Sequence, residues 1–207
     1  METTNPRKAG ALIINNLSMF NEAAILLEQQ IEVKVFEIIE EIINDWIKEN
    51  GWEGSAEWLN GEENIWMSPR EWYLFEEDQL HIAMFGFGYE HENSFSYNIA
   101  DLCNCGQSRL GFYFAKGDGI KKSFWKKYSI SEKEYLDKLE FFGFKKTDDV
   151  EFPWFIPVIL DNIKLASAYE NDDFDDVMQP LHEALDTLLK AKCLFDPIVK
   201  EISTAVK

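Results

Sequence analysis

One long helical pattern constrains the fold of this chain more than any other feature of its sequence. Across residues 18–50, apolar side chains recur at steps of three or four residues. The members of this apolar stripe are Phe20, Ala24, Leu27, Ile31, Val35, Ile38, Ile42 and Trp46. Such steps place side chains on one face of a helix, and Asn50 with Gly51 supplies the left-handed stop expected past its end. Ser18 or Asn21 is the expected N-cap.

The acidic side chains of this helix lie largely off the apolar stripe, so the helix is expected to show an acidic face to water. Charge is unevenly spread along the 207 residues, whose net charge is −18. Residues 18–67 carry 12 acids against two bases, and residues 147–207 carry 13 acids against five bases. Residues 108–146 reverse the sign, with ten bases against five acids. One basic island therefore lies between two acidic segments.

The middle of the chain predicts an antiparallel sheet. Residues 51–72 mix glycines with four tryptophans, which is typical of loops or short strands whose rings pack on something. Residues 71–75 and 80–88 are expected to form a hairpin around the turn 76–79, with 80–88 as a central strand. Alternating patterns at residues 95–99 and 110–114 predict two more strands. A three- or four-stranded antiparallel meander is the simplest assembly.

The last third of the chain predicts mainly helices. After a turn at residues 116–119, residues 120–128 have a helical pattern, and Ser131 with Glu134 is spaced as the capping box of another helix that Gly143 ends. Residues 151–160 suit a buried extended segment or a helix beginning near Pro157. Two final helices are expected at about residues 173–192 and 196–206.

These patterns predict an α+β fold: a long N-terminal helix packed on a three- or four-stranded antiparallel sheet, with C-terminal helices. Residues 18–207 are expected to form a single domain, preceded by a poorly ordered segment at residues 1–17. No run of about 18 apolar residues and no signal-peptide pattern is present, so we expect no membrane contact. Three cysteines, Cys103, Cys105 and Cys193, are an odd count that fits a reducing, cytoplasmic compartment.

Metal and cofactor chemistry has weak support in the sequence. His81, His91, Cys103 and Cys105 fall within 25 residues and are weak zinc candidates, because their spacing matches no common zinc pattern. The sequence has no nucleophile elbow, Walker loop or dinucleotide-binding motif. Glu32-Val33-Lys34 resembles a nuclease tripeptide but lies inside the helical stripe, where a surface position is favoured. We therefore expect no cofactor and no resident metal.

The basic island at residues 116–146 interleaves lysines with aromatic residues, as in proteins that track a phosphate backbone. An amphipathic helix explains the same pattern, with Phe124, Trp125 and Tyr128 facing the core and the lysines in water. Pairing of these lysines with an acidic helix is a third use. The acidic field of the other segments disfavours direct nucleic-acid binding, which favours the amphipathic helix.

An acidic run at residues 170–176 is interpreted as the start of the predicted helix 173–192, where carboxylates satisfy free N–H groups and the helix dipole. The run lacks the glycine and the terminal glutamate of a calcium loop, which argues against calcium. Whether this run shares a surface with the acidic face of residues 18–50 decides whether it belongs to a binding site.

The preferred functional hypothesis is an acidic, non-enzymatic binding protein. It would act as an inhibitor of immunity or anti-defence type, a nucleic-acid mimic whose carboxylates face a basic or nucleic-acid-binding protein partner. The expected partner-binding residues are Glu37, Glu40, Glu41, Asp45, Asp172, Asp173, Asp175 and Asp176. One alternative is a metal-dependent hydrolase with a site around the sheet. Another is a subunit of a larger assembly that uses the tryptophan-rich residues 52–72 as its contact.

Overall fold

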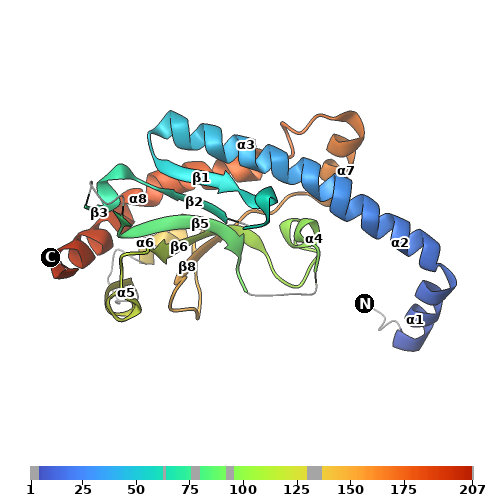
Figure 1. Cartoon of the computed structure of the whole chain (residues 1–207), viewed down its shortest axis with the longest axis horizontal. Helices are drawn as coiled ribbons and strands as arrows, with labels where there is room; N and C mark the ends of the chain where they lie inside the picture. The colour runs from blue at the N-terminus through green and yellow to red at the C-terminus, as the bar shows by residue number, and fades with distance from the viewer. Residues whose placement is uncertain (1–4, 63, 76–79, 92–95, 130–136, 207) are drawn as a thin grey trace.

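The computed structural model describes residues 5–62, 64–75, 80–91, 96–129 and 137–206 of this α+β chain. Its centre is a six-stranded antiparallel sheet, seen in Figure 1. In order across the sheet the strands are β1 (Glu53–Glu57), β2 (Asn64–Ser68), β5 (Ala83–Tyr89), β6 (Leu110–Lys116), β8 (Trp154–Pro157) and β7 (Lys145–Lys146). A separate ribbon pairs β3 (Tyr73–Phe75) with β4 (Leu80–His81).

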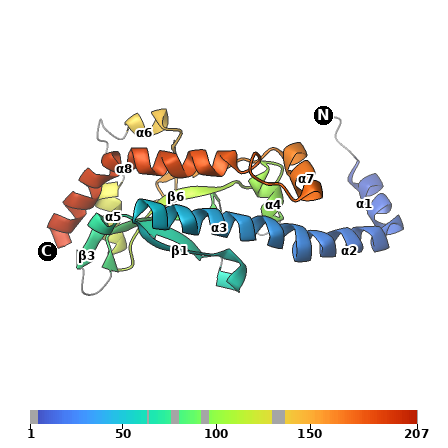
Figure 2. The ribbon, with the colours of Figure 1, turned by 90° about the horizontal axis from the view of Figure 1, so that it is seen from above.

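The helices surround this sheet unevenly. The N-terminal helical run comprises α1 (Pro6–Asn15), α2 (Leu17–Leu26), a π-helical turn η1 (Leu27–Ile31) and α3 (Glu32–Asn50). The others are α4 (Asn98–Leu102), α5 (Lys122–Ser129), α6 (Asp137–Phe141), α7 (Asn162–Asn171) and α8 (Gln179–Val206), with short turns η2 (Trp58–Glu62) and η3 (Arg70–Trp72). Figure 2 shows α3 and α8 side by side over one face of the sheet.

The core lies between that sheet face and the two covering helices. Phe85, Phe87, Phe112 and Phe114 alternate along β5 and β6, and all four are buried. Phe195 of α8 reaches down to them, with its ring centre 4.3 Å from that of Phe114. On the opposite face the ring of Tyr113 lies over Gly86, where an added Cβ would be 2.3 Å from that ring. Glycine at 86 therefore lets an aromatic ring cover the second face.

The predicted fold class is confirmed in its coarse form, but the predicted number of strands is wrong. The long helix, the antiparallel sheet and the C-terminal helices are present, and the sheet has six strands instead of three or four. Strands β1 and β2 arise inside the glycine- and tryptophan-rich residues 51–72, where glycines obscure the alternation of buried Ala56, Ile65 and Met67. The strands at 80–88 and 110–114 correspond to β5 and β6.

The predicted strand at residues 95–99 is wrong, because Asn98–Leu102 forms the short helix α4. Phe95 lies outside the described residues. The buried carboxylate of Asp101 accepts hydrogen bonds from the Ser96 hydroxyl and from the Ser108 backbone N–H. The polar residues of this segment therefore stabilise a loop through hydrogen bonds. The sequence pattern predicted them on the solvent-exposed face of a strand.

The predicted long helix is confirmed over residues 17–50, and Gly51 closes it in the left-handed conformation with φ of 66°. Its first turn is not capped as predicted, since Asn16 occupies the N-cap position and Ser18 bonds the Glu22 carboxylate instead. Residues 6–15 of the segment expected to be poorly ordered form α1, and the domain boundary at residue 18 stays a prediction. No single described helix is long and apolar enough to span a membrane, although α1 with the run Leu17–Asn50, bent by 84°, would satisfy length and composition as a pair.

The prediction of two final helices is wrong. Residues 179–206 form one helix, α8, with Pro197 inside it, instead of two helices separated near residue 195. Helix α7 at Asn162–Asn171 was not predicted, and the extended alternative for residues 151–160 is the one found, as β8. The predicted capping box at Ser131 and Glu134 lies outside the described residues.

Candidate partner-binding groove

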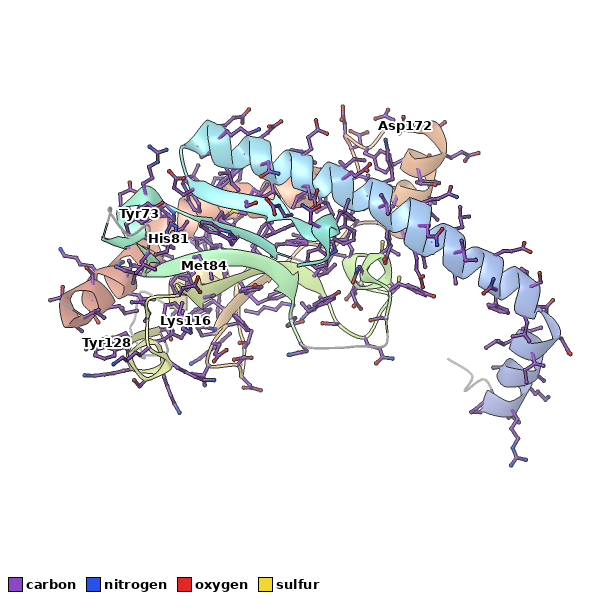
Figure 3. The ribbon with its side chains drawn as sticks, in the orientation of Figure 1. Tyr73, His81, Met84, Lys116, Tyr128 and Asp172 are labelled. Atoms are coloured by element: carbon purple, nitrogen blue, oxygen red, sulfur yellow. The ribbon has the colours of Figure 1, made fainter. Side chains whose placement is uncertain are left out.

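An acidic groove of about 540 Å³ lies between α3 and the connection from α7 to α8. Helix α3 supplies the carboxylates of Glu41, Asp45 and Glu49, and the connection supplies those of Asp172 and Asp175. The apolar lining comprises Ile38, Ile42, Trp46, Phe174 and Met178, and Lys34 and His182 complete the set. Figure 3 shows Asp172 beside α3.

The wall on α3 follows from two neighbouring rows of side chains at steps of four residues. Glu41, Asp45 and Glu49 form the acidic row, and Ile38, Ile42 and Trp46 form an apolar row next to it. Ile38 and Ile42 are half-buried at the margin of the core, whereas Trp46 and the residues Val35, Phe36, Ile39, Ile43 and Ile47 are buried in it. The predicted stripe is therefore rotated: part of it lines the groove.

The second wall is the short connection between α7 and α8, in which the apolar residues are buried and the acidic residues are exposed. Asp172 ends α7 in a left-handed conformation with φ of 51°, and α8 begins at Gln179. Phe174, Val177 and Met178 are buried and anchor the connection, while the aspartates between them are exposed. The interpretation of this acidic run as a helix start is wrong, because residues 172–178 form the turn before the helix.

Lys34 crosses the groove and pairs with its far wall. Its Nζ lies 2.9 Å from Oδ1 of Asp172 and 5.8 Å from the ring centre of Phe174. The hydrogen bond and the charge of Asp172 raise the pKa of the Lys34 ammonium; desolvation opposes this increase, and Glu37 and Glu41 add smaller increases. The groove therefore already holds one ammonium between a carboxylate and an aromatic face.

Four of the eight expected partner-binding residues come together here, namely Glu41, Asp45, Asp172 and Asp175. Asp173 and Asp176 line an adjacent hollow with Lys164 and Asn171. Glu40 instead accepts a hydrogen bond of 2.7 Å from the Leu59 backbone N–H. Glu37 acts on the charge of Lys34 without lining the groove.

Sequence reasoning missed Glu49, Lys34, His182 and the apolar floor of the groove. Glu49 had a usable signal, since it follows Asp45 by four residues on the same helix face. His182 and Phe174 had none, because their place depends on how α7 and α8 fold back toward α3. Two acidic elements that are about 130 residues apart thus share one surface.

The weak zinc candidates occupy different environments. His81 in β4 is buried with its ring 4.3 Å from Tyr73 and 5.0 Å from Trp66, and burial lowers its pKa. His91 and Cys105 are exposed, and burial raises the pKa of the half-buried Cys103 thiol to about 11. Among the described residues, no three His, Cys, Asp or Glu side chains gather as metal ligands would.

The other two sequence candidates are largely part of the fold. In α5 the indole of Trp125 is buried and the lysines Lys121, Lys122, Lys126 and Lys127 before and along the helix are exposed, which matches an amphipathic helix. Lys122 pairs with Glu151. In the tryptophan-rich stretch the side chains of Trp52, Trp58 and Trp72 are buried in the core, which leaves Trp66 partly exposed.

Comparisons with protein families, with curated proteins and with solved structures find no match to this chain. Its own residues and their geometry are therefore the evidence for function.

Proposed function

We propose that this chain is an acidic, non-enzymatic binding protein whose groove between α3 and the α7–α8 connection receives a basic segment of a protein partner. One observation carries the proposal: acidic residues from two distant parts of the sequence line the same groove. Five carboxylates face one ammonium there, so the groove keeps an excess of negative charge. A surface of this sign attracts lysine and arginine side chains and speeds their association.

The contacts of Lys34 support a lysine or arginine side chain as the ligand of this groove. Its ammonium is paired with Asp172 and lies near the Phe174 ring, as a lysine or arginine from a partner would. The apolar row of Ile38, Ile42 and Trp46 offers a surface for the methylene stems of such side chains. A partner cation beside Lys34 would find Glu41, Asp45 and Asp175 within the same groove.

An inhibitory role fits this arrangement. Carboxylates held in rows can stand where the phosphates of a nucleic acid would lie on a basic partner. The chain would then block a nuclease, a toxin or another nucleic-acid-binding protein by occupying its basic surface. This immunity or anti-defence role is the most specific form of the proposal.

The test uses a fluorescent peptide of alternating lysine and arginine, titrated with the full chain while its fluorescence anisotropy is measured. The groove variant carries Asp45→Asn and Asp175→Asn, and the control variant carries Asp118→Asn and Asp148→Asn, two exposed acids outside the groove lining. We expect about tenfold weaker binding for the groove variant at low salt and less than a twofold change for the control. Equal losses in both variants would show attraction to net charge alone and would contradict the proposal.

The natural partner is then sought with the same pair of variants. The wild-type chain, the groove variant and the control variant serve as bait in extracts of the native cell at low salt, with identification by mass spectrometry. We expect a basic protein that the wild type and the control variant retain and the groove variant loses. Inhibition of that protein's nucleic-acid binding by the wild-type chain would establish the inhibitory role.

A further inference from the structure

The N-terminal arm, defined as residues 5–31, carries most of the large apolar side chains that are exposed among the described residues. None of the described residues from 5 to 31 is buried, and α1 and α2 extend away from the sheet in both Figure 1 and Figure 2. Eight large apolar side chains of the arm are 41 to 67% exposed, namely Leu12, Ile13, Ile14, Leu17, Met19, Phe20, Ile25 and Leu26. Of the predicted apolar stripe, Phe20 is exposed and Ala24 and Leu27 are only half-buried, whereas Val35 and Trp46 are buried.

The composition of α2 indicates that something covers it. Its sequence LSMFNEAAIL has one charged residue, Glu22, and apolar side chains around most of the circumference. A helix of this kind is normally buried, and contiguous exposed apolar patches mark interaction sites.

We propose that the arm pairs with the arm of a second copy of this chain in an antiparallel helix pair. Leu17, Phe20, Ala24 and Leu27 follow one another at steps of three, four and three residues, which is the spacing of a coiled-coil seam. Placing Ala24 on the two-fold axis sets Phe20 of each copy opposite position 28 of the other, one residue from Leu27, so the two apolar side chains meet diagonally across the seam. The small Ala24 side chains at the centre let the two helices approach closely, and the interface is self-complementary.

The distribution of charge favours a second copy at this surface. The arm has Arg7 and Lys8 against Glu22 and Glu28 and is therefore neutral, while the rest of the chain carries the whole excess of 18 negative charges. Two such chains can meet at their neutral arms, and an antiparallel pairing keeps their acidic bodies at opposite ends. The same charges disfavour an anionic membrane, because two basic residues fall short of the four to eight that such surfaces usually attract.

The exposed apolar area of the arm sets an upper limit on the dimer interface. A large side chain buries roughly 150 Å² when fully covered, so the eight half-exposed side chains offer on the order of 600 Å² per copy. Of these eight, Leu17 and Phe20 lie on the seam, so two arms bury at most about 1,200 Å², the lower end of the range for stable interfaces, when the side chains beside the seam and on α1 are covered as well. The proposal uses no residue of the acidic groove and does not depend on the proposed function.

Light scattering of the full chain at about 10 to 100 µM is the first test. We expect a mass of about twice the 24.2 kDa of one chain. The variant Leu17→Ser with Phe20→Ser should give the mass of one chain with unchanged circular dichroism, because both side chains are exposed in the single copy. The control variant Ile163→Ser with Leu189→Ser, which removes exposed apolar side chains of α7 and α8, should stay dimeric.

Cysteine cross-linking tests the register. In a background where Cys103, Cys105 and Cys193 are serine, Ala24→Cys should form a disulfide between copies on mild oxidation, because the two α-carbons at the axis fall within about 7 Å. Glu22→Cys, two residues away and on the outer side of the helix, should not. Equal cross-linking at both positions would overturn the antiparallel register.

Three outcomes overturn the pairing itself. The first is a wild-type mass of one chain up to about 100 µM, and the second is a dimer that survives Leu17→Ser with Phe20→Ser. The third is a single-copy chain that sediments with phosphatidylcholine vesicles through Leu17 and Phe20, which would assign the arm to a lipid surface. None of these outcomes changes the binding of the basic peptide at the groove, so failure here is distinct from failure of the proposed function.

Discussion

His81 is buried between the rings of Tyr73 and Trp66, and burial disfavours the charged form of its imidazole. Its Nδ1 has no hydrogen-bond partner among the described residues. Desolvation lowers the pKa of His81 below 6.5, and the more distant carboxylates of Glu53 and Asp118 offset this only in part. Folding therefore favours the neutral form of His81, and this side chain is protonated more readily in the unfolded chain.

The free energy of unfolding should consequently fall as the pH drops below about 6.5, because His81 is then protonated in the unfolded chain but not in the folded one. The variant His81→Phe keeps an apolar ring and removes the titration. We expect its free energy of unfolding to fall less between pH 7.5 and pH 5 than that of the wild type. Urea unfolding at the two pH values measures this difference.

His91 is the matched control, because it is a histidine whose side chain is exposed. His91→Gln should follow the wild-type change in stability across the same pH range. If His81→Phe also followed it, the buried ring would make no contribution to the pH dependence.

The groove shows how far individual site residues could be predicted. Asp45 and Glu41 were found because a helix face can be read from steps of four residues. Asp172 and Asp175 were found as acids, but their structure was misjudged, because buried Val177 continues the spacing of Leu181 and Leu185 before the helix begins. Trp46 as part of the groove could not be found from its own segment, since the opposite wall comes from residues 172–182.

At the scale of elements, the long helix has a buried part and an exposed part, which contribute differently to stability. From Val35 onward its inner face is buried under the core, whereas the N-terminal arm lies outside it. The apolar pattern is similar in both parts, so the sequence alone could not separate them. The division is set by the sheet, whose strands end where the arm begins to project (Figure 1).

Two isoleucine substitutions on this helix should therefore have very different effects. Ile39 is 1% exposed and Ile25 is 44% exposed. Ile39→Ala should lower the free energy of unfolding by about 2 to 5 kcal/mol, because it leaves a cavity in the core. Ile25→Ala should change it by less than about 0.5 kcal/mol.

Urea unfolding at micromolar protein concentration measures both variants. Ile25 lies beside the seam of Leu17, Phe20, Ala24 and Leu27, so its small effect is expected for the single copy, at the low end of the micromolar range. Similar losses for the two variants would show that the arm is packed against the body of the same chain.

The edge of the sheet illustrates why strand number was underpredicted. β7 consists of two exposed residues, Lys145 and Lys146, which form a strand only because β8 lies beside them. Lysine-rich, very short edge strands protect a sheet from further pairing, and they have no alternation of their own to detect. The central strands β5 and β6, with their regular phenylalanines, were predictable for the opposite reason.

At the scale of the whole molecule, net charge connects the groove with the N-terminal arm. Both would bind proteins, yet salt should act on them in opposite directions. A basic peptide at the groove is attracted by the carboxylates, so screening weakens its binding. In a dimer joined by neutral arms, the rest of each chain carries an excess of 18 negative charges, so the two copies repel each other. Salt screens this repulsion and should therefore strengthen the association.

Raising sodium chloride from about 20 to about 300 mM shortens the Debye length from roughly 20 Å to roughly 6 Å. Over this range we expect the dissociation constant of the basic peptide to rise at least tenfold and that of the dimer to fall by a smaller factor. Fluorescence anisotropy follows the first and sedimentation equilibrium the second, on the same preparation. A dimer that dissociates with salt would place its contact on charged residues instead of on Leu17 and Phe20, because apolar seams are not weakened by screening.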